Sequence, residues 1–245
     1  MKECSKSIAR RLSDPNFSNR YFVGHGIDIG GKPDPLALYV GMFSRMGSVK
    51  PWDWEDGDAQ YLASVAEGAL DFVHSSHCLE HLIDPQEGLK HWFRALKPGG
   101  YLVITVPDED LYEQGIFPST FNRDHKWTFT IFKHASWSDR SINVLDLVRE
   151  LGKDAELVRI EQLSATYRFD LPRFYQTLTP VGECGIEFVV RKRPQDEVDA
   201  RGRWQRPAEL TDRELRLHYN QYRDDMRAMK SSNEGAAPFQ NDAAL

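Results

Sequence analysis

Short apolar runs alternate with helix-like segments along the first 193 residues of the chain. The runs that predict buried strands are residues 23–29, 49–53, 69–75, 101–106, 157–163 and 186–191. Helical spacing predicts helices at residues 5–12, 36–45, 79–96 and 141–151. Pro85 divides the third of these into a short helix, a turn and a longer helix. Strands that alternate with helices are typical of a doubly wound, parallel α/β sheet.

The composition changes after Arg193, because residues 194–245 are polar with few apolar side chains. Within this extension a capping box at 211–214 predicts a helix over about residues 211–230. Its apolar side chains follow one another at spacings of 4, 3, 4 and 3 and share one helix face: Leu215, Tyr219, Tyr222, Met226 and Met229. We interpret this face as packing on the chain's own domain, with a homodimer through the helix as the alternative. The expected organisation is an N-terminal helix or arm at 1–20, one domain at 21–193 and a C-terminal helical extension at 194–245.

Charge and length exclude several classes of protein. The 245 residues include 31 Lys and Arg against 37 Asp and Glu, which gives a net charge of −6. A coat for bulk nucleic acid needs a net positive face instead. No apolar run approaches the roughly 18 residues of a membrane span, and the N-terminus lacks the apolar core of a secretory signal. Three distant cysteines, Cys4, Cys78 and Cys184, exclude a disulfide framework and a cysteine-only zinc site. We therefore expect a cytoplasmic enzyme.

A glycine-rich turn follows the first predicted strand, in the run Gly26-Ile27-Asp28-Ile29-Gly30-Gly31. Glycines at a strand end let backbone N–H groups approach a ligand closely. The acid inside the run can bind loop amides or a cationic group. Lys32 and Pro33 stand where a dinucleotide site has further glycines, which argues against a nicotinamide cofactor. A purely structural glycine turn is the alternative interpretation.

An acidic and aromatic segment, residues 52–59, follows the second predicted strand. Asp53 lies 23 residues after Gly30, where an acid commonly binds a ribose diol. Asp58 can accept a hydrogen bond from an adenine amino group, and the Ala59 N–H can donate to a ring nitrogen. Either tryptophan of the segment can cover the purine face. The alternative is a solvated acidic turn.

Four motifs then occur in order: GIDIGG at 26–31, GDAQYL at 57–62, ALDFVHSSHCLEHL at 69–82 and ALKPGGYLVITVP at 95–107. In this order they resemble the class I S-adenosylmethionine-dependent methyltransferases, most of all the methyltransferase domain type 11 group. The resemblance is close over residues 22–107 and loose over 108–193. It implies a Rossmann-like, doubly wound and mostly parallel sheet with an antiparallel last strand, and S-adenosyl-L-methionine as the cofactor.

The resemblance also implies roles for particular residues. Those that match the family's cofactor-binding positions are Asp28, Gly30 and Gly31 for the methionine part, Asp53 for the ribose, Asp58 and Ala59 for the adenine, and Ser75, Ser76 and His77 beside the methyl group. Lys32 departs from the pattern by replacing a glycine. Only four residues separate Asp53 from Asp58, which shortens the second crossover and leaves Glu55 and Asp56 as alternative ribose acids.

The acceptor side has three candidate catalytic residues. Asp108 follows the fifth predicted strand, and His125 lies in a polar and aromatic loop, residues 121–127, as a candidate general base. His77 is the third, because it follows the strand end where the methyl group is expected. A loop whose charges pair with each other is the alternative. His77 and His81 are four residues apart, as in some metal sites, but the pair fits the family without a metal, so none is expected.

The function expected from these features is methyl transfer from S-adenosyl-L-methionine to a hydroxyl or amine of a small molecule. A sugar or glycan precursor is the favoured acceptor, because the candidate substrate loops are rich in polar and aromatic side chains. The alternatives are a non-catalytic cofactor-binding subunit with the same fold and a nicotinamide-dependent enzyme.

Overall fold

The structure, a computed structural model, describes residues 3–203, so the predicted capping box, helix and apolar stripe of the C-terminal extension lie outside the described residues. Met1–Gly202 forms one compact unit, and the domain limits at residues 20 and 193 stay predictions. Its regular helices are α1 (Glu3–Ser13), α2 (Pro85–Arg94), α3 (Val144–Arg149) and α4 (Gln195–Asp199). Its strands are β1 (Gly24–Ile29), β2 (Met46–Trp52), β3 (Leu70–Ser76), β4 (Leu96–Pro107), β5 (Thr128–Thr130), β6 (Ser141–Asn143), β7 (Ala155–Leu163) and β8 (Gly185–Lys192). None of the helices in residues 3–203 has the length and apolar character needed to cross a membrane.

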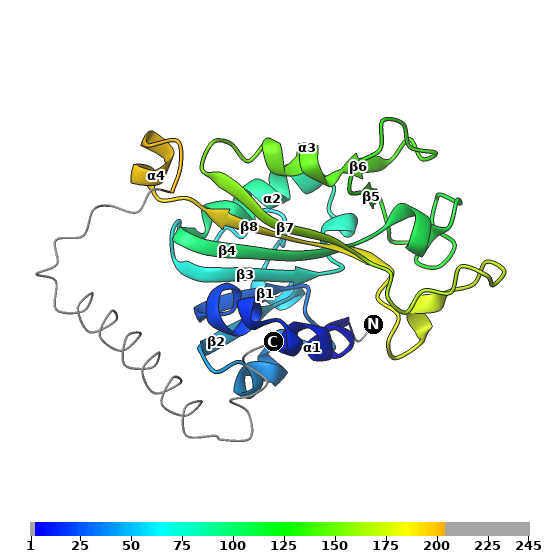
Figure 1. Ribbon diagram of the computed structural model, residues 1–245, viewed down its shortest axis with the longest axis horizontal. Helices are drawn as coiled ribbons and strands as arrows, with labels where there is room; N and C mark the ends of the chain where they lie inside the picture. The colour runs from blue at the N-terminus through cyan, green and yellow to red at the C-terminus, as the bar shows by residue number, and fades with distance from the viewer. Residues whose placement is uncertain (1–2, 204–245) are drawn as a thin grey trace, which may run out of the picture. The chain divides into compact units, whose positions relative to one another are not determined.

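Six strands form the central sheet in the order β2-β1-β3-β4-β8-β7 (Figure 1). The first four run parallel, whereas β8 is antiparallel to both β4 and β7. This arrangement confirms the predicted Rossmann-like, mostly parallel sheet with an antiparallel last strand. Strands β5 and β6 form a separate parallel pair beside it. The six apolar runs read from the sequence are the six strands of the central sheet.

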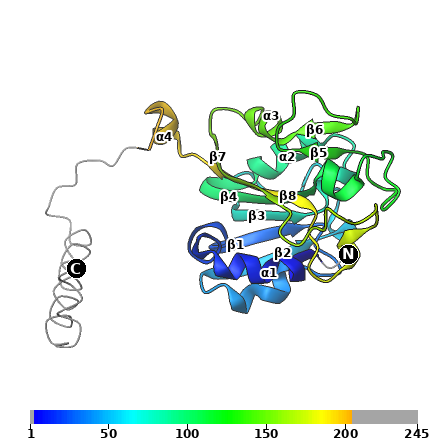
Figure 2. The ribbon, with the colours of Figure 1, turned by 45° about the vertical axis from the view of Figure 1, so that its right-hand side comes forward.

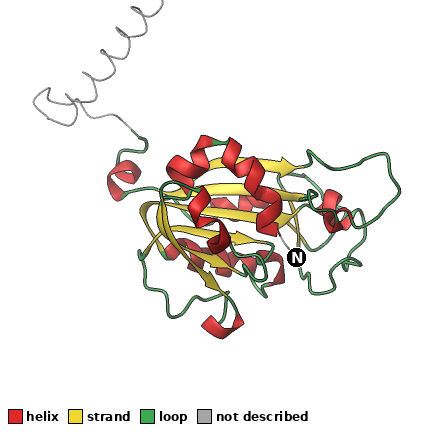
Figure 3. Cartoon of the chain, turned by 90° about the horizontal axis from the view of Figure 1, so that it is seen from below, coloured by secondary structure: helices red, strands yellow, loops and turns green. Residues whose placement is uncertain are grey.

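Helices cover both faces of the sheet (Figures 2 and 3). Successive side chains of a strand point to opposite faces, so Phe72 and Val73 of β3 enter different cores. Val73 packs in the core beneath α2 and α3, together with Trp92 and Leu147. Phe72 packs in the core beneath α1, together with Ile8. The sheet is therefore a middle layer between helices, and its central strands β4 and β8 are buried along most of their length.

Pro85 divides residues 79–96 as predicted, because it occupies the first turn of α2. Asp84 caps this helix by accepting hydrogen bonds from the N–H groups of Gln86 and Glu87, both at 3.0 Å. A single 3₁₀ turn, Leu79–His81, precedes it. The short helix and the longer helix are thus both present.

Two predicted helices differ from the sequence-based expectation. The helix expected from residue 141 begins only at Val144, because Ser141–Asn143 pairs with β5 as strand β6 and the Asn143 side chain caps α3. The helix expected at 36–45 is a 3₁₀ helix, Leu36–Met42. The remaining short turns are Phe17–Tyr21, Trp54–Asp56, Glu109–Glu113 and Gln176–Leu178. Helical spacing alone did not distinguish a cap and a short strand from the first turn of a helix.

Candidate active site

A cavity of about 810 Å³ opens where β1, β2 and β3 end. Ligand sites in open α/β sheets lie at this edge, beyond the carboxyl ends of the strands, and the volume is typical of a small-molecule site. Its walls come from the turn after β1, from residues 52–61 after β2, from residues 76–83 after β3 and from the loop at 122–126. The start of α1 closes one side with Glu3 and Cys4.

Most of the predicted cofactor residues line this cavity: Asp28, Gly30, Gly31, Asp53, Asp58, Ala59, Ser76 and His77. Ser75 is buried behind the wall, where its hydroxyl donates to the Ile29 carbonyl at 2.9 Å. Two predicted catalytic residues, His125 and Asp108, are buried and lie outside the lining. The structure therefore gathers the motifs of the cofactor side and leaves two candidates of the acceptor side behind the wall.

The Asp28 carboxylate organises the turn after β1. It is fully buried and accepts a hydrogen bond from the Leu36 N–H at 2.7 Å. A left-handed Gly30, with φ of +71°, turns the chain around the carboxylate, as the glycine-rich motif predicts. At Gly31 the backbone comes so close that an added Cβ would lie 2.7 Å from Asp28 Cγ. The acid thus fixes the loop that forms one wall of the cavity.

The three candidate ribose acids have different surroundings. Glu55 pairs with Lys32 at 2.8 Å, and Asp56 pairs with Lys50 at 2.9 Å. Asp53 caps the turn at 54–56 by accepting from the Trp54 N–H. Of the three carboxylates only that of Asp53 belongs to a residue of the cavity lining.

A cluster of histidines surrounds Glu80 behind the cavity wall, and two of them, His77 and His81, line the cavity. His77, held by the left-handed backbone that follows β3 (φ +55°), places Nδ1 3.4 Å from Glu80 Oε1. His125 Nε2 lies 3.7 Å and His81 Nε2 lies 3.8 Å from the same oxygen. Burial by itself raises the pKa of Glu80, but the three imidazoles, His77 foremost, outweigh burial and bring this pKa to about 2.

The other two predicted catalytic residues, His125 and Asp108, are held by hydrogen bonds to neighbouring groups. His125 Nδ1 hydrogen-bonds to Glu113 Oε1 at 2.7 Å. Asp108 accepts from the N–H groups of Asp110 and Leu111 and from the Gln162 amide. Burial outweighs these hydrogen bonds and raises the pKa of Asp108. The role of each as a catalytic group stays a prediction.

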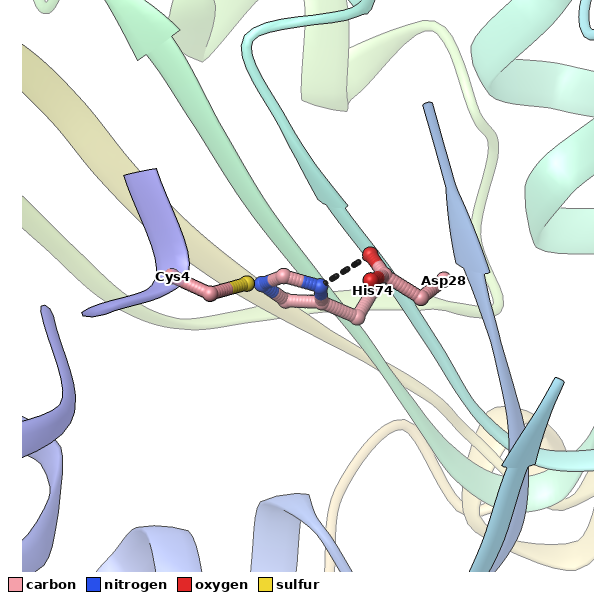
Figure 4. A group of neighbouring side chains, drawn as sticks. All are labelled: Cys4, Asp28 and His74. Atoms are coloured by element: carbon pink, nitrogen blue, oxygen red, sulfur yellow. Dashed lines mark hydrogen bonds and ion pairs between the residues drawn. The ribbon is translucent and has the colours of Figure 1, made fainter. Parts of the chain in front are cut away.

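A buried chain of polar groups connects α1 with Asp28 on the face of the sheet that α1 covers. His74 Nδ1 bonds to Asp28 Oδ1 at 2.6 Å, and Arg11 Nη1 bonds to His74 Nε2 at 3.0 Å. Figure 4 shows the His74 imidazole between the Asp28 carboxylate and the Cys4 thiol. Arg11 continues the chain to Glu187 Oε2 at 2.8 Å. Since Arg11 donates, His74 accepts at Nε2 and donates from Nδ1, which is the neutral tautomer.

The buried carboxylate of Glu187 makes the fold sensitive to acid. Burial raises its pKa, but the charges of Arg11 and Arg10 outweigh burial and lower the pKa to about 2. Because the pKa of Glu187 is lower in the folded state than in the unfolded chain, its ion pairs stabilise the fold fully above about pH 4.5. This stabilisation is lost as the pH falls towards about 2. We expect the free energy of unfolding, measured in urea, to fall over this window by about 3 kcal/mol. A Glu187→Gln variant lacks this titration, so an acid dependence as steep as that of the wild type would contradict the assignment.

The sequence did not predict some of the residues that line the cavity. Glu3 and Cys4 precede the first motif by more than twenty residues and reach the cavity only because α1 packs beside the sheet edge. His81 was noted for its spacing from His77, but its place on the lining was not expected. Asn122, Asp124 and Lys126 belong to the loop that the sequence had marked as a substrate loop. That mixture of polar, charged and aromatic types was the signal that located them.

Residues 15–137, half of the chain, match the family model described as a methyltransferase domain. The fold and the motifs around the cavity define a class I methyltransferase, an enzyme that uses S-adenosyl-L-methionine. The chain belongs to this methyltransferase-domain family. The nicotinamide alternative and the non-catalytic alternative are thereby set aside.

Solved structures with similar folds include methyltransferases from three organisms. An S-adenosylmethionine-dependent methyltransferase from Aquifex aeolicus is 12% identical, with 78% of this chain and 90% of that chain covered and a TM-score of 0.47. One from Archaeoglobus fulgidus is 19% identical, with coverages of 78% and 95% and a TM-score of 0.42. Phosphoethanolamine N-methyltransferase 2 from Haemonchus contortus, in complex with S-adenosyl-L-methionine, is 16% identical, with coverages of 77% and 53% and a TM-score of 0.48. No curated protein matches the sequence.

Proposed function

We propose that this enzyme transfers the cofactor's methyl group to a hydroxyl or amine of a small molecule, with a sugar or glycan precursor as the acceptor. The observation that carries the proposal is the composition of the cavity. Its walls after β1 and β2 hold most motif residues of the cofactor side, whereas the segment after β3 and the loop at 122–126 add His77, His81, Asn122, Asp124 and Lys126. Such polar side chains suit an acceptor with many hydrogen-bonding groups.

On the cofactor side, we assign Asp28, Gly30 and Gly31 to the methionine part and Asp53 to the ribose. The position of Asp53 on the cavity wall supports it over Glu55 and Asp56, each of which already pairs with a lysine. Asp58 and Ala59 are assigned to the adenine. Ser75, Ser76 and His77 are assigned to the strand end beside the methyl group.

In this reaction a lone pair of the acceptor attacks the sulfonium methyl in line, so positioning supplies most of the catalysis. A hydroxyl or amine gains from a nearby base. His77 is the predicted catalytic residue that lines the cavity, while His125 and Asp108 lie behind the wall. We therefore assign contact with the reacting groups to His77. His125 and Asp108 can act on the reaction only indirectly, through the side chains that separate them from the cavity.

The test of the cofactor side is calorimetric. S-adenosylhomocysteine should bind the full chain and raise its melting temperature. Asp53→Ala should weaken this binding by about 1–3 kcal/mol, because charge-assisted hydrogen bonds to the ribose are lost. Glu55→Ala is the matched control and should leave the affinity within about 0.5 kcal/mol, as is usual for surface substitutions. Loss of affinity in Glu55→Ala but not in Asp53→Ala would transfer the ribose role to Glu55.

The test of the acceptor uses cofactor labelled on its methyl group. Sugars, amines, quinones and lipids are incubated with the enzyme, and the labelled product is separated from the cofactor. Transfer to a sugar hydroxyl or amine is the expected result. Transfer confined to quinones or lipids would refute the sugar assignment while leaving the methyltransferase activity in place.

A further inference from the structure

Glu80 and two of the three histidines around it have buried polar atoms that hydrogen bonding does not explain. Both Glu80 oxygens are buried without a hydrogen-bond partner, and so are His77 Nδ1 and His125 Nε2. The Glu80 side chain has no exposed surface, and neither does that of His125. An unsatisfied buried polar group is unfavourable, and a charged one more so. Four such atoms facing one another indicate a missing ligand.

In two of the imidazoles, the ring nitrogen that points away from Glu80 already has a hydrogen-bond partner. His125 Nδ1 bonds to the Glu113 carboxylate at 2.7 Å, and His81 Nδ1 bonds to the Asp124 carbonyl at 3.1 Å. These acceptors fix the Nδ1 side of each ring and direct the Nε2 atoms towards Glu80. Carboxylates and backbone carbonyls commonly orient metal-binding histidines in this way.

We propose that Glu80, His81 and His125, with His77 beside them, bind a divalent first-row transition-metal ion. Their nitrogens lie 3.4–3.8 Å from Glu80 Oε1. Donor atoms of a tetrahedral zinc site lie about 3.3–3.5 Å apart, because Zn–N bonds are about 2.0–2.1 Å long. The donor atoms of Glu80, His81 and His125 all fall within 4.8 Å of one another. Imidazole and carboxylate ligands without thiolate suit Zn²⁺, Fe²⁺ or Co²⁺.

Two chain segments hold the site together. The turn after β3 supplies His77, Glu80 and His81, and the loop at 121–127 supplies His125. The Lys126 N–H donates to the Glu80 carbonyl at 3.0 Å, and Trp127 Nε1 donates to the Leu82 carbonyl at 3.1 Å. The ligands are therefore arranged before an ion arrives.

The second cluster of metal-ligating types in the described part of the chain, Cys4, Asp28 and His74, has a different character. Both nitrogens of His74 have partners there, Asp28 on one side and Arg11 on the other. The buried Arg11 guanidinium already supplies the positive charge, so this cluster needs no cation. The contrast favours the Glu80 cluster as the metal site.

The site opens towards the cavity through His81, whose side chain is 31% exposed. With Glu80, His81 and His125 as the three protein ligands, the fourth position of a tetrahedral ion stays open. On the proposed function, on which this step rests, a hydroxyl of the acceptor would take that position and release its proton to water more readily. The oxygen then attacks the methyl carbon. The new O–C bond forms as the C–S bond breaks, and the electron pair stays on sulfur as a neutral thioether. This chemistry selects a hydroxyl rather than an amine as the acceptor.

Metal binding is measured directly, without an acceptor. The full chain is treated with a chelator and titrated with Zn²⁺ by calorimetry and with Co²⁺ by visible absorption. We expect one ion per chain. His81→Ala and Glu80→Gln should weaken binding by at least about 100-fold, and Glu113→Gln, which changes only an outer partner, by about 10–100-fold. His134→Ala, with an exposed imidazole outside the cluster, is the matched control and should bind like the wild type.

Each variant is also titrated with S-adenosylhomocysteine, because retained binding shows that the fold is intact. A wild-type chain that binds S-adenosylhomocysteine but no metal at micromolar concentrations would overturn the proposal, as would metal binding unchanged in both His81→Ala and Glu80→Gln. A chain that binds metal as expected but methylates no hydroxyl would refute the acceptor assignment and leave the metal site standing.

Discussion

Replacing Arg11 by methionine is expected to lower the free energy of unfolding by about 3–5 kcal/mol, because it leaves a buried carboxylate short of a partner. Arg11 Nη2 and Nε bond to Glu187 Oε2 at 2.8 and 3.0 Å, and both side chains are essentially unexposed. Arg10 donates to both Glu187 oxygens, at 2.7 and 3.2 Å, but is partly exposed and also pairs with Glu183, so it replaces only part of the lost charge. His74 also loses the donor to its Nε2.

Urea unfolding of Arg11→Met beside Arg149→Met measures this effect. Arg149 pairs with Asp146 on the surface of α3, so the same substitution there should change stability by less than about 0.5 kcal/mol. The double variant Arg11→Met with Glu187→Gln should recover part of the loss, because the unpaired charge is removed as well. A loss below about 1 kcal/mol in Arg11→Met would show that water or Arg10 compensates the carboxylate.

Gly31→Ala is expected to reduce the affinity for S-adenosylhomocysteine by about 100-fold, the scale of loss that a displacement of about 1 Å produces in an active site. The new Cβ would lie 2.7 Å from Asp28 Cγ and 3.2 Å from Pro35 Cα. Asp28 cannot withdraw, because it is held by the Leu36 N–H and by His74 on opposite sides. The loop that lines the cavity must therefore move instead.

Gly41→Ala is the matched control, because a Cβ at that position meets no atom within 4 Å. Calorimetry with S-adenosylhomocysteine should give wild-type affinity for Gly41→Ala and the large loss for Gly31→Ala. Melting temperatures of the two proteins without ligand show whether the fold itself is affected. Full affinity in Gly31→Ala would mean that this loop is not a wall of the cofactor site.

The sequence by itself determined the architecture of the sheet. Strand β4 lies in the middle of the sheet with most of its residues buried, so it appears as the continuous apolar run 101–106. Strands β2 and β7 are only partly buried and include polar residues. Pro85 and Asp84 located the start of α2 for a local reason, since capping and the fixed proline backbone act within a few residues. Residues 141–143 were misassigned because their pairing with Thr128–Thr130 is not local. Most of the motif residues predicted for the cofactor side line one cavity, because a strand end and its glycine turn are adjacent in sequence.

Only the tertiary structure decided which distant groups meet. Arg11, His74 and Glu187 lie in α1, β3 and β8, and no spacing in the sequence indicates that one buried network joins them. His125 was predicted to face the acceptor, yet the loop turns it inward against Glu113 and Glu80. No metal site was expected from the spacing of His77 and His81, because two histidines on one turn do not specify a third histidine and a buried carboxylate. Long-range packing and the burial of charged groups determine which residues meet in such clusters. A single segment of the sequence does not encode either of them.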